Sequence, residues 1–430
     1  MNSNRLFGAL EKVFVVSALF LFSGGLLTLV RQMTGAISDL NQTDPVSQAV
    51  FLLVYAITAC LVMVWRKRFT SVVTRDTLLW LLIGIALLSV LWSAAPEVTL
   101  RRGIALIGTT LLGVYVAMRY GQREQLQLLA WALGIGALLS LLFTLAVPAY
   151  GIMEEPQAQG WRGVYTHKNA LGRNMALGAL IFMILALSER RYRWVSWAGF
   201  GLSIILLLLS NSITGLVIFL VLLPLLPLFR ATRWPYTLAV PFLIAAVLLL
   251  GSLALWGVAH EGTVLGFFNR DVTLTGRTVV WPAVFDMIWE RPWLGYGYQA
   301  FWLGWDGPSS YVLIVTDFDP LSAHSGYLDL WLNLGLLGVV VFAFGFLRAA
   351  IRAIYRVRST KIDEGLWPSA YLTYMLLYNI TESAILARNS ISWVLYVIVV
   401  LSMPRDRAKP SKGLTTSVSP SFEDQGRVTR

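Results

Sequence analysis

The chain has 430 residues, of which 57% are hydrophobic and 13% carry a charge, and its formal net charge is +11. Soluble domains average about 25% charged residues, so this composition excludes an ordinary soluble protein and predicts a membrane protein. The basic residues gather in short gaps between apolar runs, which is typical of membrane orientation and argues against binding to nucleic acid. A single cysteine, Cys60, excludes an internal disulfide and a cysteine metal site.

Twelve apolar runs follow one another, each about long enough to cross roughly 30 Å of hydrocarbon as an α-helix. We expect them at 13–30, 46–65, 77–95, 103–118, 125–148, 170–188, 194–209, 213–229, 236–258, 325–347, 366–386 and 391–403. The first run is too long for a signal-peptide core, and no small-residue cleavage site follows it. The expected fold is therefore all-α, a single multi-pass membrane domain over residues 1–404.

The distribution of basic residues predicts the orientation of this domain. With the amino terminus in the cytoplasm, 24 of the 34 Lys and Arg residues fall on the inner side and ten on the outer side. Cytoplasmic loops carry an excess of Lys and Arg, so we expect both termini to be cytoplasmic. The polar residues 405–430 are expected to form a disordered cytoplasmic tail.

Two segments on the expected outer side are long enough to build a site, at 149–169 and 259–325. Within the second, residues 278–289 have apolar helical spacing with tryptophans nearby, which predicts a helix lying flat at the membrane interface. His324 stands at the end of this segment, immediately before a predicted span. Because imidazole changes charge near neutral pH, His324 is a candidate proton acceptor.

The same outer segments carry cations that could bind phosphate through forked hydrogen bonds. Arg277 follows a glycine at the start of the expected interfacial helix; the other candidates are Arg162, Lys168, Arg173 and Arg291. The alternative for each is a residue that only anchors the chain among lipid headgroups. Arg173 lies about a turn inside a predicted span, where a charge either faces a cavity or reaches back to the surface.

Two of the three outer histidines, His324 and His167, could instead be structural residues held by hydrogen bonds. Carboxylates lie in the same segments, but no His-x-x-x-His or His-Glu-x-x-His spacing occurs, so neither a metal nor another cofactor is predicted. Asp329, near the outer end of its span, is expected to order the site rather than conduct ions. No phosphate-loop, dinucleotide or serine-nucleophile motif is present, so the activated group must arrive with the substrate.

The run that begins at His324 resembles a motif of the O-antigen ligase and polysaccharide polymerase superfamily. That motif has His, then Asn, Ser or Gln, nine free positions, Gly, two free positions, and a small residue or Tyr. His324, Ser325, Gly335 and Gly338 fit the fixed positions. The family also carries an Arg with a bulky apolar residue four positions later in its long periplasmic loop, which Arg277 and Trp281 match.

Two further stretches, 163–172 and 290–297, resemble the branch of exopolysaccharide production proteins of the ExoQ type. The resemblance implies a GT-C-type glycosyltransferase fold in the bacterial inner membrane, with its active site in the periplasm. It also implies an undecaprenyl-diphosphate-linked oligosaccharide donor, a glycan or lipid acceptor, a metal-free reaction and an inverted product. The partners expected are therefore these substrates and the membrane lipids.

Carried onto this sequence, the resemblance makes His324 the general base that activates the acceptor hydroxyl. Arg277 would bind the donor diphosphate, and Arg162 or Lys168 would supply the second cation. His167, Arg173, Arg291 and Tyr296 are the remaining candidates for substrate binding.

The function expected is polymerisation of exopolysaccharide or O-antigen-like repeat units. One alternative is a ligase that moves a finished glycan to lipid A core or another acceptor, because both activities share the motifs. Alternatives of other classes are a small-solute transporter and a scaffold for a polysaccharide assembly complex. The sequence does not disclose the sugar, the linkage or the acceptor, nor whether a chain-length regulator binds.

Overall fold

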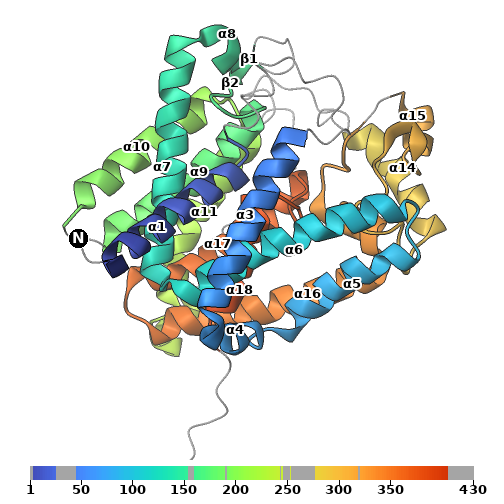
Figure 1. Cartoon of the computed structure of the whole chain (residues 1–430). Helices are drawn as coiled ribbons and strands as arrows, with labels where there is room; N and C mark the ends of the chain where they lie inside the picture. The colour runs from blue at the N-terminus through green and yellow to red at the C-terminus, as the bar shows by residue number, and fades with distance from the viewer. Residues whose placement is uncertain are drawn as a thin grey trace, which may run out of the picture.

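The computed structural model of this protein describes residues 3–25, 45–153, 159–188, 191–242, 244–245, 252, 277–317 and 320–404. These residues are mostly helical, and Figure 1 shows the helices gathered into one bundle. The longer helices are α1 (Ser3–Phe22), α3 (Pro45–Val64), α5 (Thr77–Leu88), α6 (Pro96–Arg119), α7 (Gln122–Ala146), α9 (Lys168–Ser188), α10 (Arg193–Leu209), α11 (Ile213–Ala231), α14 (Arg277–Glu290), α16 (Gly326–Ser359), α17 (Trp367–Thr381) and α18 (Ile391–Ser402).

Short elements connect these helices. They are α4 (Arg66–Val73), η1 (Ser89–Leu91), α8 (Pro148–Gly151), η3 (Gly304–Asp306), α15 (Ser310–Thr316) and η4 (Asp363–Leu366). Two strands, β1 (Ile152–Met153) and β2 (Gly160–Trp161), pair in antiparallel fashion, with Ile152 opposite Trp161.

The prediction of an all-α membrane protein is confirmed. Eleven of the twelve predicted runs contain a helix given above; in the remaining run, 236–258, the described residues 236–242 and 244–245 are also helical, and more than half of the run lies outside the described residues. Six of the described helices are long and apolar enough to cross a membrane: α3, α6, α7, α9, α11 and α16. The pair formed by α4 and Thr77–Leu91, bent by 92°, would make a seventh span. The count of twelve crossings stays a prediction.

The positions of several helix ends differ from the apolar runs. The first helix begins at Ser3, ten residues before the predicted start at 13, and includes polar residues such as Glu11. The helix predicted at 325–347 continues to Ser359, and its last three turns carry four arginines, Arg348, Arg352, Arg356 and Arg358. The helix predicted at 278–289 is α14, confirmed at Arg277–Glu290. The predicted tail at 405–430 lies outside the described residues.

Helix α9 lies at the centre of one half of the bundle, packed against α7, α10, α11 and α17. Small residues allow this close packing. An added Cβ on Gly172 would lie 2.3 Å from the Ser212 side chain, so the two backbones approach closely there. Interfaces between membrane helices commonly use small residues in this way. The other half contains α5, α6, α16 and α18, with α18 against α6 and α16 against α5.

Helix α16 is interrupted at Gly335, whose φ of 64° and ψ of −169° suit only glycine. The loop after α14 crosses this break. The N–H groups of Tyr296 and Gly297 donate to the carbonyls of Leu332 and Asn333, at 2.7 and 3.0 Å. In return, the N–H of Leu336 donates to the carbonyl of Pro292 at 2.8 Å. The two family-like stretches, 290–297 and the run from His324, are therefore joined through their backbones.

Candidate active site

Helix α14 is fixed beside the segment that carries His324. Its inner face buries Val280, Val284 and Ile288 in a small apolar cluster with Phe301 and Leu332. At its first turn, the indole Nε1 of Trp281 donates to the carbonyl of Ala323 at 2.9 Å. Figure 1 shows α14 and α15 together at one side of the bundle, where α5 ends and α6 begins. The expected outer segment is thus anchored directly at the residue before His324.

His324 lies in the left-handed region, with φ of 48°. Few residues other than glycine adopt this conformation, although His, Asn and Asp do so more readily than most. Its side chain is 42% exposed, so a substrate can reach the ring. The Nδ1 atom lies 3.9 Å from a carboxylate oxygen of Glu382 and has no hydrogen bond within the described residues. The backbone therefore holds an accessible imidazole beside a negative charge.

Asp329 is hydrogen-bonded to the segment around His324, which supports the predicted ordering role. Its buried carboxylate accepts hydrogen bonds from the indole of Trp302 at 2.7 Å and from the backbone N–H of Ala323 at 3.1 Å. It also accepts a hydrogen bond from the hydroxyl of Ser383. These hydrogen bonds tie three separate segments to the first turn of α16. In the chain, His324 lies between Ala323 and Asp329, two of the residues that they join.

The turn after α17 positions Glu382. The side-chain carbonyl of Asn379 accepts hydrogen bonds from the N–H groups of Ala384 and Ile385, at 2.8 and 3.1 Å. The backbone carbonyl of Glu382 accepts from the N–H of Gly326 at 3.0 Å, which fixes the turn against the start of α16. Sequence reasoning gave Glu382 no role in the site, although an acid within an apolar run is itself a signal.

Arg173 also lies near Glu382. Its Nη1 donates to the hydroxyl of Tyr378 at 2.6 Å, and its guanidinium lies 5.5 Å from the centre of that ring. Its charge also interacts with that of Glu382. The hydroxyl of Tyr374 donates to the backbone carbonyl of Arg173 at 3.3 Å. Of the two predicted alternatives for Arg173, these contacts favour a guanidinium turned toward neighbouring helices.

The other candidates of the first outer segment lie in the loop that leads into α9. The guanidinium Nε of Arg162 donates to the carbonyl of Tyr150 at 2.6 Å. The Lys168 side chain is buried, and its ammonium donates to the carbonyl of Gln159 at 3.0 Å. The Nδ1 of His167 accepts from the N–H of Asn169 at 3.1 Å. Each side chain thus has a partner that helps to shape this loop.

Arg291 and Tyr296 lie at the end of α14. Tyr296 is buried, and its hydroxyl forms hydrogen bonds with the Met287 carbonyl at 2.9 Å and the Glu290 carboxylate at 2.7 Å. Burial, followed by the bond to Glu290, raises the pKa of this phenol above its ordinary value, so it stays neutral. The exposed guanidinium of Arg291 lies 4.9 Å from the Tyr296 ring centre. The contacts of Tyr296 therefore indicate a structural role at the end of α14.

Arg277 is the first residue of α14, but its side chain lies outside the described residues. The predicted meeting of Arg277 with His324 therefore stays a prediction. No three His, Cys, Asp or Glu side chains in the described ranges converge as a metal site would require.

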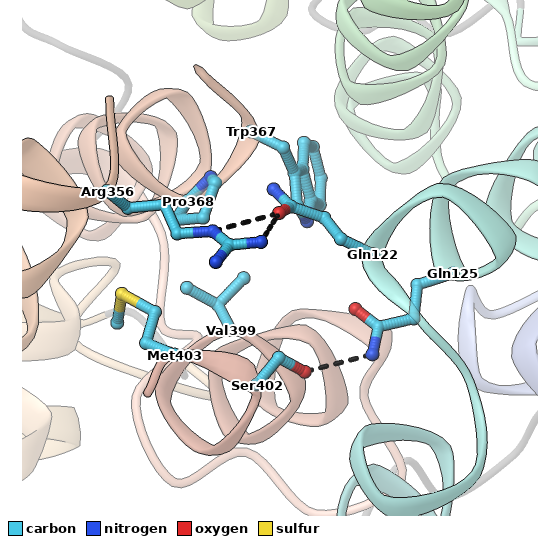
Figure 2. Close-up of a pocket in the computed structure, with 8 residues that line it drawn as sticks. All are labelled: Gln122, Gln125, Arg356, Trp367, Pro368, Val399, Ser402 and Met403. Carbon is cyan, nitrogen blue, oxygen red and sulfur yellow. Dashed lines mark hydrogen bonds between the residues drawn. The ribbon is translucent and has the colours of Figure 1, made fainter. Parts of the chain in front are cut away.

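A separate small cavity lies far along α16 from His324, near Arg356 (Figure 2). Its volume is about 10 Å³, room for one water molecule at most. Gln122 accepts two hydrogen bonds from Arg356, and Gln125 donates to Ser402 at 2.9 Å. This cavity lies between α7, α16 and α18 and is too small for a glycan.

Comparison with known proteins agrees with the motifs. A family described as O-Antigen ligase matches residues 198–343, a region that includes both Arg277 and His324. The chain is 26% identical over 289 residues to a protein of Rhizobium meliloti (strain 1021) named Exopolysaccharide production protein ExoQ. That match covers 65% of this chain and 65% of the relative's length. The resemblance predicted from the motifs is thereby confirmed.

Proposed function

We propose that this protein, as a member of the O-antigen ligase and ExoQ-type family, is a membrane glycosyltransferase that polymerises exopolysaccharide or O-antigen-like repeat units. Its donor is a glycan linked to undecaprenyl diphosphate, and its acceptor is the hydroxyl of another glycan. The proposed reaction needs no metal and inverts the anomeric configuration.

The observation that supports this proposal best is the placement of His324 beside Glu382, at the point where α14 is anchored. His324 takes the proton of the acceptor hydroxyl as its oxygen attacks the anomeric carbon. The bond between that carbon and the diphosphate oxygen breaks, and the lipid diphosphate leaves. Glu382 stabilises the imidazolium that forms, because an opposite charge within about 4 Å favours the protonated ring.

Fixed cations are proposed to take up the charge that develops on the diphosphate. Preorganised donors of this kind lower the barrier because they need no reorganisation during the reaction. Arg277 is the first of these, since residues four apart share a helix face and Trp281 reaches the residue before His324. Arg162 and Lys168 remain candidates for the second cation. Because Arg173 interacts with Glu382, we add Arg173 to the candidates for the second cation.

The proposed setting is the inner membrane, with twelve crossings, a GT-C-type fold and both termini in the cytoplasm. The excess of basic residues on one side of the predicted spans supports this orientation. His324 and the proposed cations then face the periplasm, where the lipid-linked donor is available.

A ligase is the second candidate, because the matching family carries that description. In that case the acceptor is lipid A core or another molecule, and the same residues act on a finished glycan. The name of the Rhizobium relative favours exopolysaccharide production instead.

Lipid-linked intermediates distinguish the two candidates. In a strain whose only copy is His324→Ala, loss of polymerisation leaves single lipid-linked repeats, whereas loss of ligation leaves long lipid-linked chains. Membrane insertion of the variant is checked by immunoblot against the wild type. The proposal would be overturned if the variant were present at the wild-type level and neither single lipid-linked repeats nor long lipid-linked chains accumulated.

A further inference from the structure

A second cavity lies between α1, α6 and the start of α7, at the opposite end of α6 from the candidate active site. The first turn of α6 reaches the active-site side, where the hydroxyl of Thr99 donates to the carbonyl of Tyr298. The last turn of α6 reaches the cavity through Arg119. The cavity has a volume of about 390 Å³, within the range of pockets that hold small ligands.

One wall of the cavity is a single face of α1. Arg5, Gly8, Ala9 and Lys12 line it, and their spacing of three, one and three residues places them on one side of a helix. The two small residues leave space, and a cation stands at each end of that space. Neighbouring positions of the same helix are apolar and exposed, as expected of side chains that face lipid: Leu6, Leu10 and Val13.

The opposite wall presents a guanidinium that is held in place. Arg119 donates through Nε and Nη2 to one carboxylate oxygen of the buried Glu11, at 3.2 and 3.1 Å. Its guanidinium also lies 4.4 Å from the ring centre of Trp65 and 5.4 Å from that of Tyr120. The Trp65 indole donates to Glu11 at 2.9 Å, so the whole group is fixed. A guanidinium held in this way loses little freedom when it binds an anion.

Tyr120 supports Arg119 at this wall of the cavity. This residue lines the cavity and is only 4% exposed. Its hydroxyl interacts with that of Tyr115 but has no hydrogen bond of good geometry within the described residues. The Tyr115 hydroxyl donates to Glu11 at 3.1 Å. Because this hydroxyl is enclosed, the part of Tyr120 that lines the cavity is its ring, which lies beside the Arg119 guanidinium.

The balance of charge in the lining favours an anion. Three cations line the cavity, Arg5, Lys12 and Arg119, and two carboxylates offset them, those of Glu124 in the lining and of Glu11 behind Arg119, so one positive charge remains. One oxygen of Glu124 accepts from the N–H of Gly121 at 3.2 Å, and the other lies 3.9 Å from the Lys12 ammonium. We propose that this cavity binds the phosphate of an anionic phospholipid headgroup. Arginine and lysine beside lipid-facing apolar residues are the chemistry that recognises such headgroups.

Lipid binding to the purified full chain in detergent tests this site directly. Native mass spectrometry with phosphatidylglycerol and phosphatidylcholine gives the affinity for each lipid. We expect saturable binding of phosphatidylglycerol, and about tenfold or greater weakening in the Arg5→Gln/Lys12→Gln variant. The matched control is Arg66→Gln/Lys67→Gln, which removes two exposed cations from α4 and should leave binding unchanged.

Equal weakening in the α4 control would overturn the proposal, because it would show a general attraction to basic residues. Equal affinities for phosphatidylcholine and phosphatidylglycerol would also overturn the proposal. Displacement of the lipid by millimolar inorganic phosphate would overturn the choice of a lipid and assign the cavity to a soluble phosphate compound.

Discussion

The indole Nε1 of Trp281 donates a 2.9 Å hydrogen bond to the carbonyl of Ala323, the residue immediately before His324. Trp281 is the apolar member of the Arg277 motif, and His324 begins the second motif. The bond therefore connects the two motifs for which the family resemblance predicts a catalytic role. A bulky aromatic residue with one donor does more at this position than fill space.

Trp281→Phe keeps most of the ring packing and removes the donor. A neutral hydrogen bond of this kind contributes about 1 kcal/mol, so we expect transfer to fall by roughly fivefold to tenfold. The assay follows polymer length from a purified lipid-linked donor. Trp289→Phe is the control, because Trp289 is exposed on the same helix. If both variants lost activity equally, the bond to Ala323 would have no special role.

Asp329→Asn tests whether Asp329 positions His324. The carboxylate accepts hydrogen bonds from Trp302, Ala323 and Ser383, and an amide cannot accept all three through one oxygen. We expect kcat to fall about tenfold or more while KM for the donor changes little. A rise in KM with unchanged kcat would instead indicate that Asp329 acts through donor binding.

The sequence predicted the apolar helices and the residues of the two motifs, because both depend on local spacing. It could not predict contacts between distant segments. Glu11 lies two residues before the first predicted run, 13–30, and its partner Arg119 is more than a hundred residues away. In the same way, nothing near Glu382 in the chain shows that it faces His324. Such pairs depend on which helices pack together.

Gly335 shows the same limit within a motif. The resemblance marks Gly335 as a fixed position but does not explain it. In the structure, glycine is needed because the backbone has a positive φ and because Trp293 passes close to it. The requirement comes from a loop some forty residues earlier in the chain, which the spacing of the motif does not reveal.

Gly335→Ala should therefore destabilise the protein strongly. A Cβ at this position would lie 2.1 Å from the carbonyl oxygen of Trp293, and the conformation alone costs about 1–3 kcal/mol for other residues. Size-exclusion profiles after heating should show a clearly lower unfolding temperature. Gly345→Ala is the control in the same helix, since its nearest neighbour would lie 3.4 Å away. A normal unfolding temperature for Gly335→Ala would contradict the close approach.

Chelation tests the proposed metal-free reaction. If fixed guanidinium groups stabilise the leaving diphosphate, EDTA should leave the rate of transfer by the purified protein unchanged. The measurement compares initial rates with and without chelator, using protein purified without divalent ions. Loss of turnover that magnesium or manganese restores would defeat this part of the proposal.

The same assay on Arg277→Lys should show reduced activity, because lysine keeps the charge but loses the forked geometry.

The buried ion pair between Asp76 and Arg352 gives a prediction about stability. Their closest atoms are 2.6 Å apart, and the side chains are only 1% and 3% exposed. Asp76 also caps α5 by accepting from the N–H of Leu79, and Arg352 reaches the carbonyl of Val400 on α18. Removing one partner leaves a buried charge unpaired, which costs about 3–5 kcal/mol.

We therefore expect Asp76→Asn alone to lower the unfolding temperature markedly, because Arg352 keeps its charge. The Asp76→Asn/Arg352→Met variant should recover much of the loss, since asparagine can still cap α5 and methionine fills the space without a charge. Thermal unfolding of the wild type, both single variants and the double variant measures this coupling. Additive losses in the double variant would show that the two side chains stabilise the bundle independently.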